Sequence, residues 1–140
     1  MDTLSELQTI QHRVLDQELN QWKRGQQLSG NGVSFDDNLD EIQVRCEILT
    51  ETIWTIRRQL KNLSQMCSQL PLGPTHEGSH DRQIRTLIER IDKLLNNLVF
   101  KTFIVEKQPP QVLKTQTRFE ATIRLLVGGK LNVDMTPPQV

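Results

Sequence analysis

The segment 36–70 carries apolar residues at alternating spacings of three and four, and this pattern restricts the fold more than any other feature of the chain. The positions are Leu39, Ile42, Cys46, Leu49, Ile53, Ile56, Leu60, Leu63, Cys67 and Leu70. Such an a/d seam is typical of a long helix, because a strand's period of two would scatter these residues over both faces. At about 1.5 Å per residue, the predicted helix is roughly 50 Å long. It needs partner helices to cover its seam.

The ends of this helix have their own signals. Ser34 and Asp37 resemble a capping box at the start, and Pro71, Gly73 and Pro74 predict the end near Leu70.

Two further segments have helical periodicity. Residues 3–29 place apolar side chains on one stripe, which includes Trp22, and we expect this tryptophan to lie in the core. Residues 81–102 carry a broader stripe, from Ile84 to Val99, which suits a helix packed against two neighbours. The connections between the segments are short, so consecutive helices should be antiparallel.

Beyond Thr102 the apolar period changes to that of strands. Residues 119–127 alternate between apolar and polar, residues 128–130 predict a turn, and Leu131, Val133 and Met135 predict a return strand. The run 103–105 is a further short strand candidate. The predicted fold is therefore mainly α: a helical bundle over 1–102, followed by a β module over 103–140.

Composition excludes several classes of protein. The formal net charge is +0, although six basic residues face three acidic ones after position 100. No apolar run has the ~20 residues that a membrane span needs, and the N-terminus has no signal-peptide pattern. We therefore expect no membrane association.

Catalytic and metal sites are not indicated either. Cys46 and Cys67 read as small core residues, and His76 and His80 as residues of a solvated loop over 71–80. The sequence contains no nucleophile–base pattern and no phosphate-binding glycine loop. We expect no enzyme activity, no metal and no cofactor.

The junction between the two modules resembles a known family. The segment Val105–Phe119 (VEKQPPQVLKTQTRF), followed by Arg124–Val127 (RLLV), resembles the border between the coiled-coil and DNA-binding domains of the signal transducer and activator of transcription (STAT) family. Residues 18–27 (ELNQWKRGQQ) resemble the end of that family's second coiled-coil helix, although most members carry a basic residue where Gly25 stands. The absence of an insert between Pro110 and Val112 resembles the prolactin- and interleukin-4-responsive subgroup.

The resemblance implies a fold and a cellular role. Family members have an antiparallel four-helix coiled coil, an immunoglobulin-like β-barrel that contacts DNA, a linker, an SH2 domain and a tail tyrosine. We expect this chain to be a fragment with helices two to four and the first barrel strands. Its parent should be a latent cytoplasmic transcription factor of cytokine signalling through Janus kinases, which dimerises on tyrosine phosphorylation and enters the nucleus.

The resemblance also implies site residues. Lys114 should meet a DNA phosphate, Thr115, Gln116 and Thr117 should lie near the DNA backbone or groove edge, and Arg118 should add charge. The alternative for these residues is an ordinary solvated strand.

A second class of function also fits the sequence. Val44, Ile48 and Trp54 lie opposite the helical seam and could bind partner proteins. The chain would then be a stand-alone helical adaptor that does not bind DNA.

Overall fold

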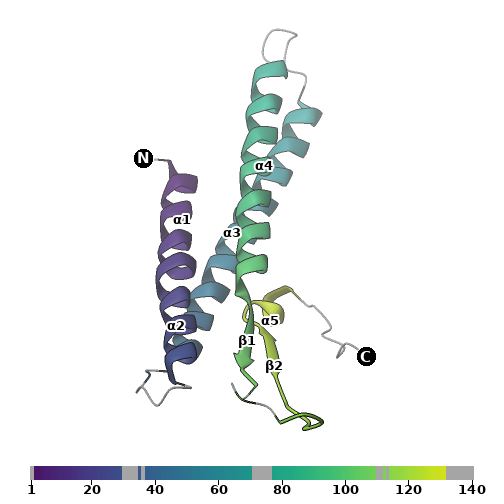
Figure 1. Ribbon diagram of the computed structural model, residues 1–140. Coiled ribbons are helices and arrows are strands. Elements are labelled where there is room, and N and C mark those ends of the chain that lie inside the picture. Colours follow the sequence, from purple (N-terminus) through teal and green to yellow (C-terminus); the bar gives the residue numbers. More distant parts are fainter. Residues whose placement is uncertain are drawn as a thin grey trace.

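The computed structural model describes residues 2–29, 35, 37–70, 77–109, 112 and 114–131. The elements are α1 (Thr3–His12), the π-helical segment η1 (Arg13–Leu19), α2 (Asn20–Ser29), α3 (Leu39–Gln69), α4 (Glu77–Thr102), β1 (Phe103–Lys107), β2 (Thr122–Leu125) and α5 (Gly128–Leu131). The fold is mainly helical, as the apolar periods predict (Figure 1).

The first three elements form one helical rod, so the helix predicted over 3–29 is confirmed. Its middle is π-helical, which the sequence did not indicate, and this segment buries Val14, Leu15 and Leu19. The rod continues through Gly25 to Ser29. An added Cβ at Gly25 would lie 2.8 Å from Cδ2 of Phe35, so a larger residue there would displace the Phe35 ring.

The helices α3 and α4 pack along each other and run in opposite directions (Figure 1). Asn38 is the N-cap of α3, and Asp37 accepts a hydrogen bond of 2.9 Å from the indole nitrogen of Trp22. The predicted capping role of Asp37 is therefore wrong, and Ser34 lies outside the described residues. The prediction of a core tryptophan is confirmed, since Trp22 is buried and its ring centroid lies 6.0 Å from that of Phe35.

The predicted loop over 71–80 is wrong at its end. The helix α4 begins at Glu77, four residues before the predicted start, so His80 is an exposed helical residue. His76 lies outside the described residues.

The two strands form an antiparallel ribbon directly after α4. Phe103 pairs with Leu125, Ile104 with Arg124 and Val105 with Ile123, and the register shifts between Val105 and Lys107. The amide of Leu126 donates to the carbonyl of Thr102 at 3.1 Å, which ties the ribbon to the last turn of α4.

The predicted hairpin differs from the structure at its strand and at its turn. The strand predicted over 119–127 is shorter, spanning Thr122–Leu125, and within the described residues it pairs with β1. Residues 128–130, which predicted a turn, begin the short helix α5. Val133 and Met135 lie outside the described residues.

One core joins the helices to the ribbon. It contains residues of the rod, of the first half of α3 and of the second half of α4, together with Ile104, Leu126 and Val127. Among the described helices, none combines the length and apolarity that crossing a membrane requires.

Candidate nucleic-acid interface

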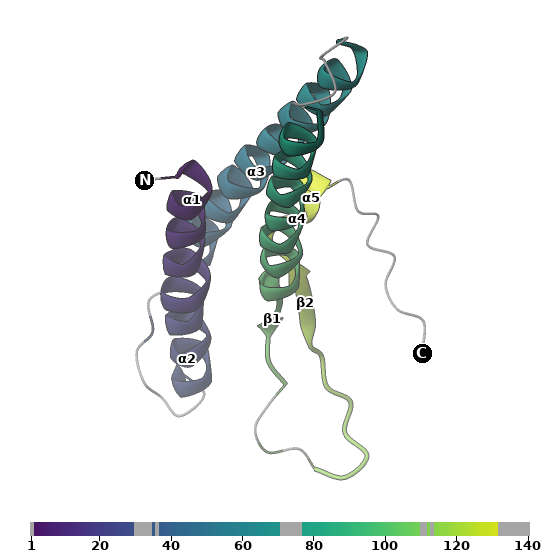
Figure 2. The ribbon, with the colours of Figure 1, turned by 90° about the horizontal axis from the view of Figure 1, so that it is seen from above.

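The predicted DNA-facing residues lie in the connection between β1 and β2. Figure 2 shows the described part of this connection that leads into β2, coloured yellow-green, extending beyond the end of α2. Within it, residues 114–117 form a turn in which the amide of Thr117 donates to the carbonyl of Lys114 at 3.1 Å. The structure thus brings Lys114, Thr115, Gln116, Thr117 and Arg118 together in one exposed loop.

Gln116 has an unusual backbone conformation at the third position of this turn. Its φ is 66°, in the left-handed region that normally selects glycine or asparagine. A glutamine held there costs on the order of 1 kcal/mol. Such strain is frequent at functional positions, and it sets Gln116 apart from its neighbours.

The five side chains of the loop differ in what they can offer a ligand. Lys114, Thr115, Gln116 and Arg118 are exposed, whereas the hydroxyl of Thr117 donates to the carbonyl of Lys114 at 2.5 Å and so holds the turn together. Arg118 also lines an open groove of about 800 Å³ between the ribbon and the end of α2. The ammonium of Lys107, in the same groove, lies 3.6 Å from the carboxylate of Glu120.

Two residues that sequence reasoning missed hold the ribbon against the helices. The guanidinium of Arg124 contacts Glu106 of β1 and also Asp40 and Gln43 near the start of α3. The amide group of Gln26, on α2, donates to the backbone carbonyls of Val105 and Glu106. The residue type of Arg124 gave no signal for the first contact, because a polar residue at that position fits the alternating pattern of a half-exposed strand.

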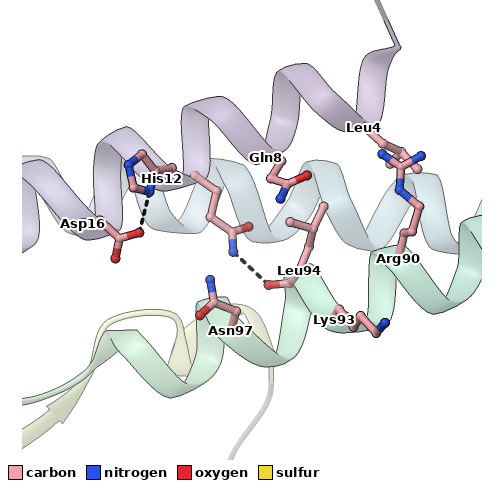
Figure 3. Close-up of a pocket in the computed structure, with 9 residues that line it drawn as sticks. Leu4, Gln8, His12, Asp16, Arg90, Lys93, Leu94 and Asn97 are labelled. Carbon is pink, nitrogen blue, oxygen red and sulfur yellow. Dashed lines mark hydrogen bonds and ion pairs between the residues drawn. The ribbon is translucent and has the colours of Figure 1, made fainter.

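A second hollow lies between the rod and α4. It has a volume of about 420 Å³, and its lining includes Gln8, His12, Asp16, Arg90 and Lys93 (Figure 3). At its floor, the amide nitrogen of Gln11 donates to the carbonyl of Leu94 at 3.0 Å. The other amide atom, Oε1 of Gln11, is buried and has no hydrogen-bond partner within the described part of the chain.

Charges at one end of this hollow connect the rod with α4. The carboxylate of Asp16 accepts a hydrogen bond from the ammonium of Lys101 and lies 2.6 Å from Nδ1 of His12. The Lys101 hydrogen bond, aided by His12, holds the pKa of Asp16 below its ordinary value, although partial burial opposes this shift. The contacts of Asp16 with Lys101 and His12 therefore stabilise the folded chain when Asp16 is ionised.

The thiol of Cys46 is part of the core. Cys46 is buried, and burial raises the pKa of its thiol to about 12, so it stays a neutral core side chain. No group of three or more metal-binding side chains occurs within the residues that the structure describes.

The three residues predicted to bind partner proteins are exposed on α3. Exposed fractions are 53% for Val44, 58% for Ile48 and 48% for Trp54. The guanidinium carbon of Arg57 lies 5.4 Å from the ring centroid of Trp54, so a cation–π contact covers part of this ring.

Two domain models of one protein family match this chain. Residues 1–95 match the model for the STAT transcription factor coiled-coil domain, and residues 107–140 match the model for the STAT protein DNA binding domain. The human protein Signal transducer and activator of transcription 6 is 39% identical over 140 residues, which cover 99% of this chain and 15% of that protein. The resemblance inferred from the junction residues is confirmed. The chain belongs to the STAT family of transcription factors.

Proposed function

We propose that this chain works as part of a dimeric STAT-type transcription factor, in which the loop 114–118 contacts DNA phosphates. The observation that carries the proposal is the exposed turn 114–117 in the connection between the strands, which begins at Lys114 and is followed directly by Arg118. This turn lies in the part of the chain that matches the STAT DNA-binding domain.

The side chains of the loop suit contact with the phosphate backbone of DNA better than recognition of its bases. A lysine ammonium neutralises a phosphate from several geometries, and an exposed hydroxyl such as that of Thr115 can donate to a phosphate oxygen. Thr117 contributes through the turn, because its hydroxyl hydrogen is already used. Lys114 and Arg118 thus supply affinity and register, and the choice of DNA sequence lies elsewhere in the parent protein.

The cellular setting of the proposal follows that of the family. The parent protein waits in the cytoplasm, dimerises when a tail tyrosine is phosphorylated and bound by an SH2 domain, and acts in the nucleus under cytokine control. The helical part, α1 to α4, supplies surfaces for other proteins. The function is binding and regulation of transcription, without enzymatic chemistry.

A helical adaptor that binds partner proteins without DNA is the second candidate. The exposed side chains of Val44, Ile48 and Trp54 favour it, because they place apolar area on the solvent side of α3. The two candidates differ in one measurable property: only the first requires Lys114 to meet a phosphate.

The deciding experiment is a DNA titration of the dimeric full-length parent at several salt concentrations, with cognate and scrambled duplexes. Each subunit of the dimer supplies one loop, so Lys114→Ala removes two phosphate contacts. We expect weaker binding to both duplexes and a salt slope reduced by roughly two, with sequence preference retained.

Lys61→Ala is the matched control. Lys61 is exposed on α3, where the same loss of charge should leave the slope unchanged. An unchanged slope for Lys114→Ala would assign this lysine to a solvated loop and would favour the adaptor.

A further inference from the structure

Arg124 is the main polar link between the ribbon and α3. Its Nη1 donates to the Glu106 carboxylate at 2.9 Å, within the ribbon, and its Nη2 donates to the amide oxygen of Gln43 on α3. Nη2 also lies 3.5 Å from the carboxylate of Asp40, which is almost fully exposed. One guanidinium therefore joins β1, β2 and α3.

This side chain occupies a position where an ordinary ribbon would have an apolar residue. Arg124 pairs with Ile104, and the side of the ribbon that carries these two faces the helices, since Ile104 is buried. Only 29% of the Arg124 side chain is exposed. A partly buried guanidinium with carboxylate and amide acceptors forms stronger and more directional hydrogen bonds than a surface ion pair.

Gln26 approaches the same place from α2. It donates to the carbonyls of Val105 and Glu106, where the register of the ribbon shifts. A bulge leaves backbone groups without a ladder partner, and a side-chain donor from a neighbouring element satisfies them. The bulge is thus held by Gln26 on one side and, through Glu106, by Arg124 on the other.

A second polar link to α3, among the described residues, is of a different kind. The ammonium of Lys130 lies 2.6 Å from the carboxylate of Glu51, but both side chains are more exposed than that of Arg124. Lys130 belongs to α5, which follows β2, so this pair does not restrain the end of the ribbon from which the loop extends. Exposed ion pairs of this type contribute little to rigidity.

We propose that Arg124 is a positioning residue: by joining the ribbon to α3, it fixes the direction in which the loop 114–118 is presented. The inference rests on the proposed function of that loop as a DNA contact. Arg124 touches no DNA in this proposal and acts through the geometry of the ribbon. Lysine cannot replace it, because a single ammonium lacks the planar fork that reaches Glu106 and Gln43 together.

The first test measures the position of the loop without DNA. Spin labels are placed at Val44→Cys on α3 and Thr115→Cys in the loop, both exposed, in a Cys67→Ser background. Cys46 is left in place, because its buried thiol is not ionised at neutral pH. Labelled chain is diluted with unlabelled chain, so pulsed electron paramagnetic resonance reports distances within one molecule.

The unsubstituted chain should give a narrow distance distribution, and Arg124→Gln and Arg124→Lys should both broaden it. Gln43→Ala, which removes the less exposed of the two acceptors on α3 and leaves the ribbon intact, should broaden it as well. Arg85→Gln is the matched control, because Arg85 pairs with Asp81 within α4 at 2.7 Å and touches neither strand. Equal widths for Arg124→Gln and Arg85→Gln would overturn the proposal.

The second test measures DNA affinity in the full-length dimer. Arg124→Gln should weaken binding roughly three- to tenfold, because a loosened loop must be ordered when it binds. The salt slope should stay as in the unsubstituted protein, in contrast to Lys114→Ala, since no phosphate contact is lost. A reduced slope would make Arg124 a phosphate contact, and an unchanged affinity with a broadened distribution would remove its role in binding; either result overturns the proposal.

The two tests separate this inference from the function on which it rests. If the unsubstituted dimer fails to bind DNA, the proposed function is wrong. The distance distributions still decide whether Arg124 holds the loop.

Discussion

The two halves of α3 follow the same heptad pattern but have different surroundings. In the first half, from Leu39 to Ile53, every seam residue is buried, because the rod and α4 both cover it. In the second half, Leu63 and Leu70 are 47% and 55% exposed, and α3 and α4 extend as a pair beyond the start of α1 (Figure 1). A heptad seam therefore predicts that one face of a helix is packed, but it does not predict how many other helices cover that face.

The strongest way to test this difference is to place a charge in each half of the seam. Ile53→Asp puts a carboxylate where the side chain is fully buried, and we expect a loss of several kcal/mol in the free energy of unfolding. Leu63→Asp, at a half-exposed seam position, should cost under about 1 kcal/mol. Thermal and urea unfolding of both variants provide the measurement, and similar losses would show that the distal half is as well covered as the proximal half.

The helices were predictable because their signal is local. The periods over 3–29, 36–70 and 81–102 place each helix within a few residues of its observed bounds, since an apolar stripe needs no knowledge of what covers it. The pairing of the strands was not predictable in the same way. The sequence predicted a return strand beginning at Leu131 as the partner of residues 119–127, whereas β2 pairs with β1, where Ile104 and Arg124 make tertiary contacts with the helices.

The candidate site also has one part that the sequence predicts and another that depends on tertiary contacts. The position of the loop 114–118 follows from the resemblance, whereas the left-handed Gln116 and the links from Gln26 and Arg124 depend on backbone geometry that residue types do not encode. Gln11 is a further case. It follows Leu7 by four residues and so continues the apolar stripe of the rod, and that position was the one hint that a polar side chain would be buried.

A smaller effect should separate the two tryptophans. Trp22→Phe removes the hydrogen bond to Asp37 and leaves space beside Phe35. We therefore expect a loss of about 1–2 kcal/mol in the free energy of unfolding. Trp54→Phe, on the solvent side of α3, should cost under about 0.5 kcal/mol. Unfolding in urea at a constant m-value tests both, and a larger loss for Trp54 would mean that a neighbouring surface covers it in solution.

A pH-dependent effect should appear at the contact between the rod and α4. The pKa of Asp16 is lowered in the folded chain, so its contribution to stability is present above the ordinary value of 3.8 and is lost as the pH falls through the lowered value. Asp16→Asn should therefore reduce stability at pH 7 by under about 1 kcal/mol. The difference from the unsubstituted chain should shrink progressively as the pH falls below 3.8. A difference that does not change with pH in this range would assign the effect to packing.

The smallest effect on stability is expected at the distal end. Met66→Lys replaces an exposed apolar side chain and should change the free energy of unfolding by less than about 0.5 kcal/mol. The same substitution should clearly weaken self-association of the isolated chain. The reason is that exposed Leu63, Met66 and Leu70 favour contact between copies of the chain. Sedimentation should show association for the unsubstituted chain and less for Met66→Lys. A compact monomer before substitution would contradict this expectation.

No residue separates α4 from β1, so the number of residues at this junction determines which side of β1 faces the helices. Thr102 ends the helix and Phe103 begins the strand, and the Thr102 hydroxyl donates to the carbonyl of Leu98 at 2.7 Å. Side chains alternate along a strand, so one inserted residue between them would turn Phe103 and Val105 toward the helices and Ile104 toward solvent. A deletion would do the same. Single-residue insertions or deletions between Thr102 and Phe103 should therefore abolish the ribbon. Substitutions, which leave the number of residues unchanged, should be far better tolerated.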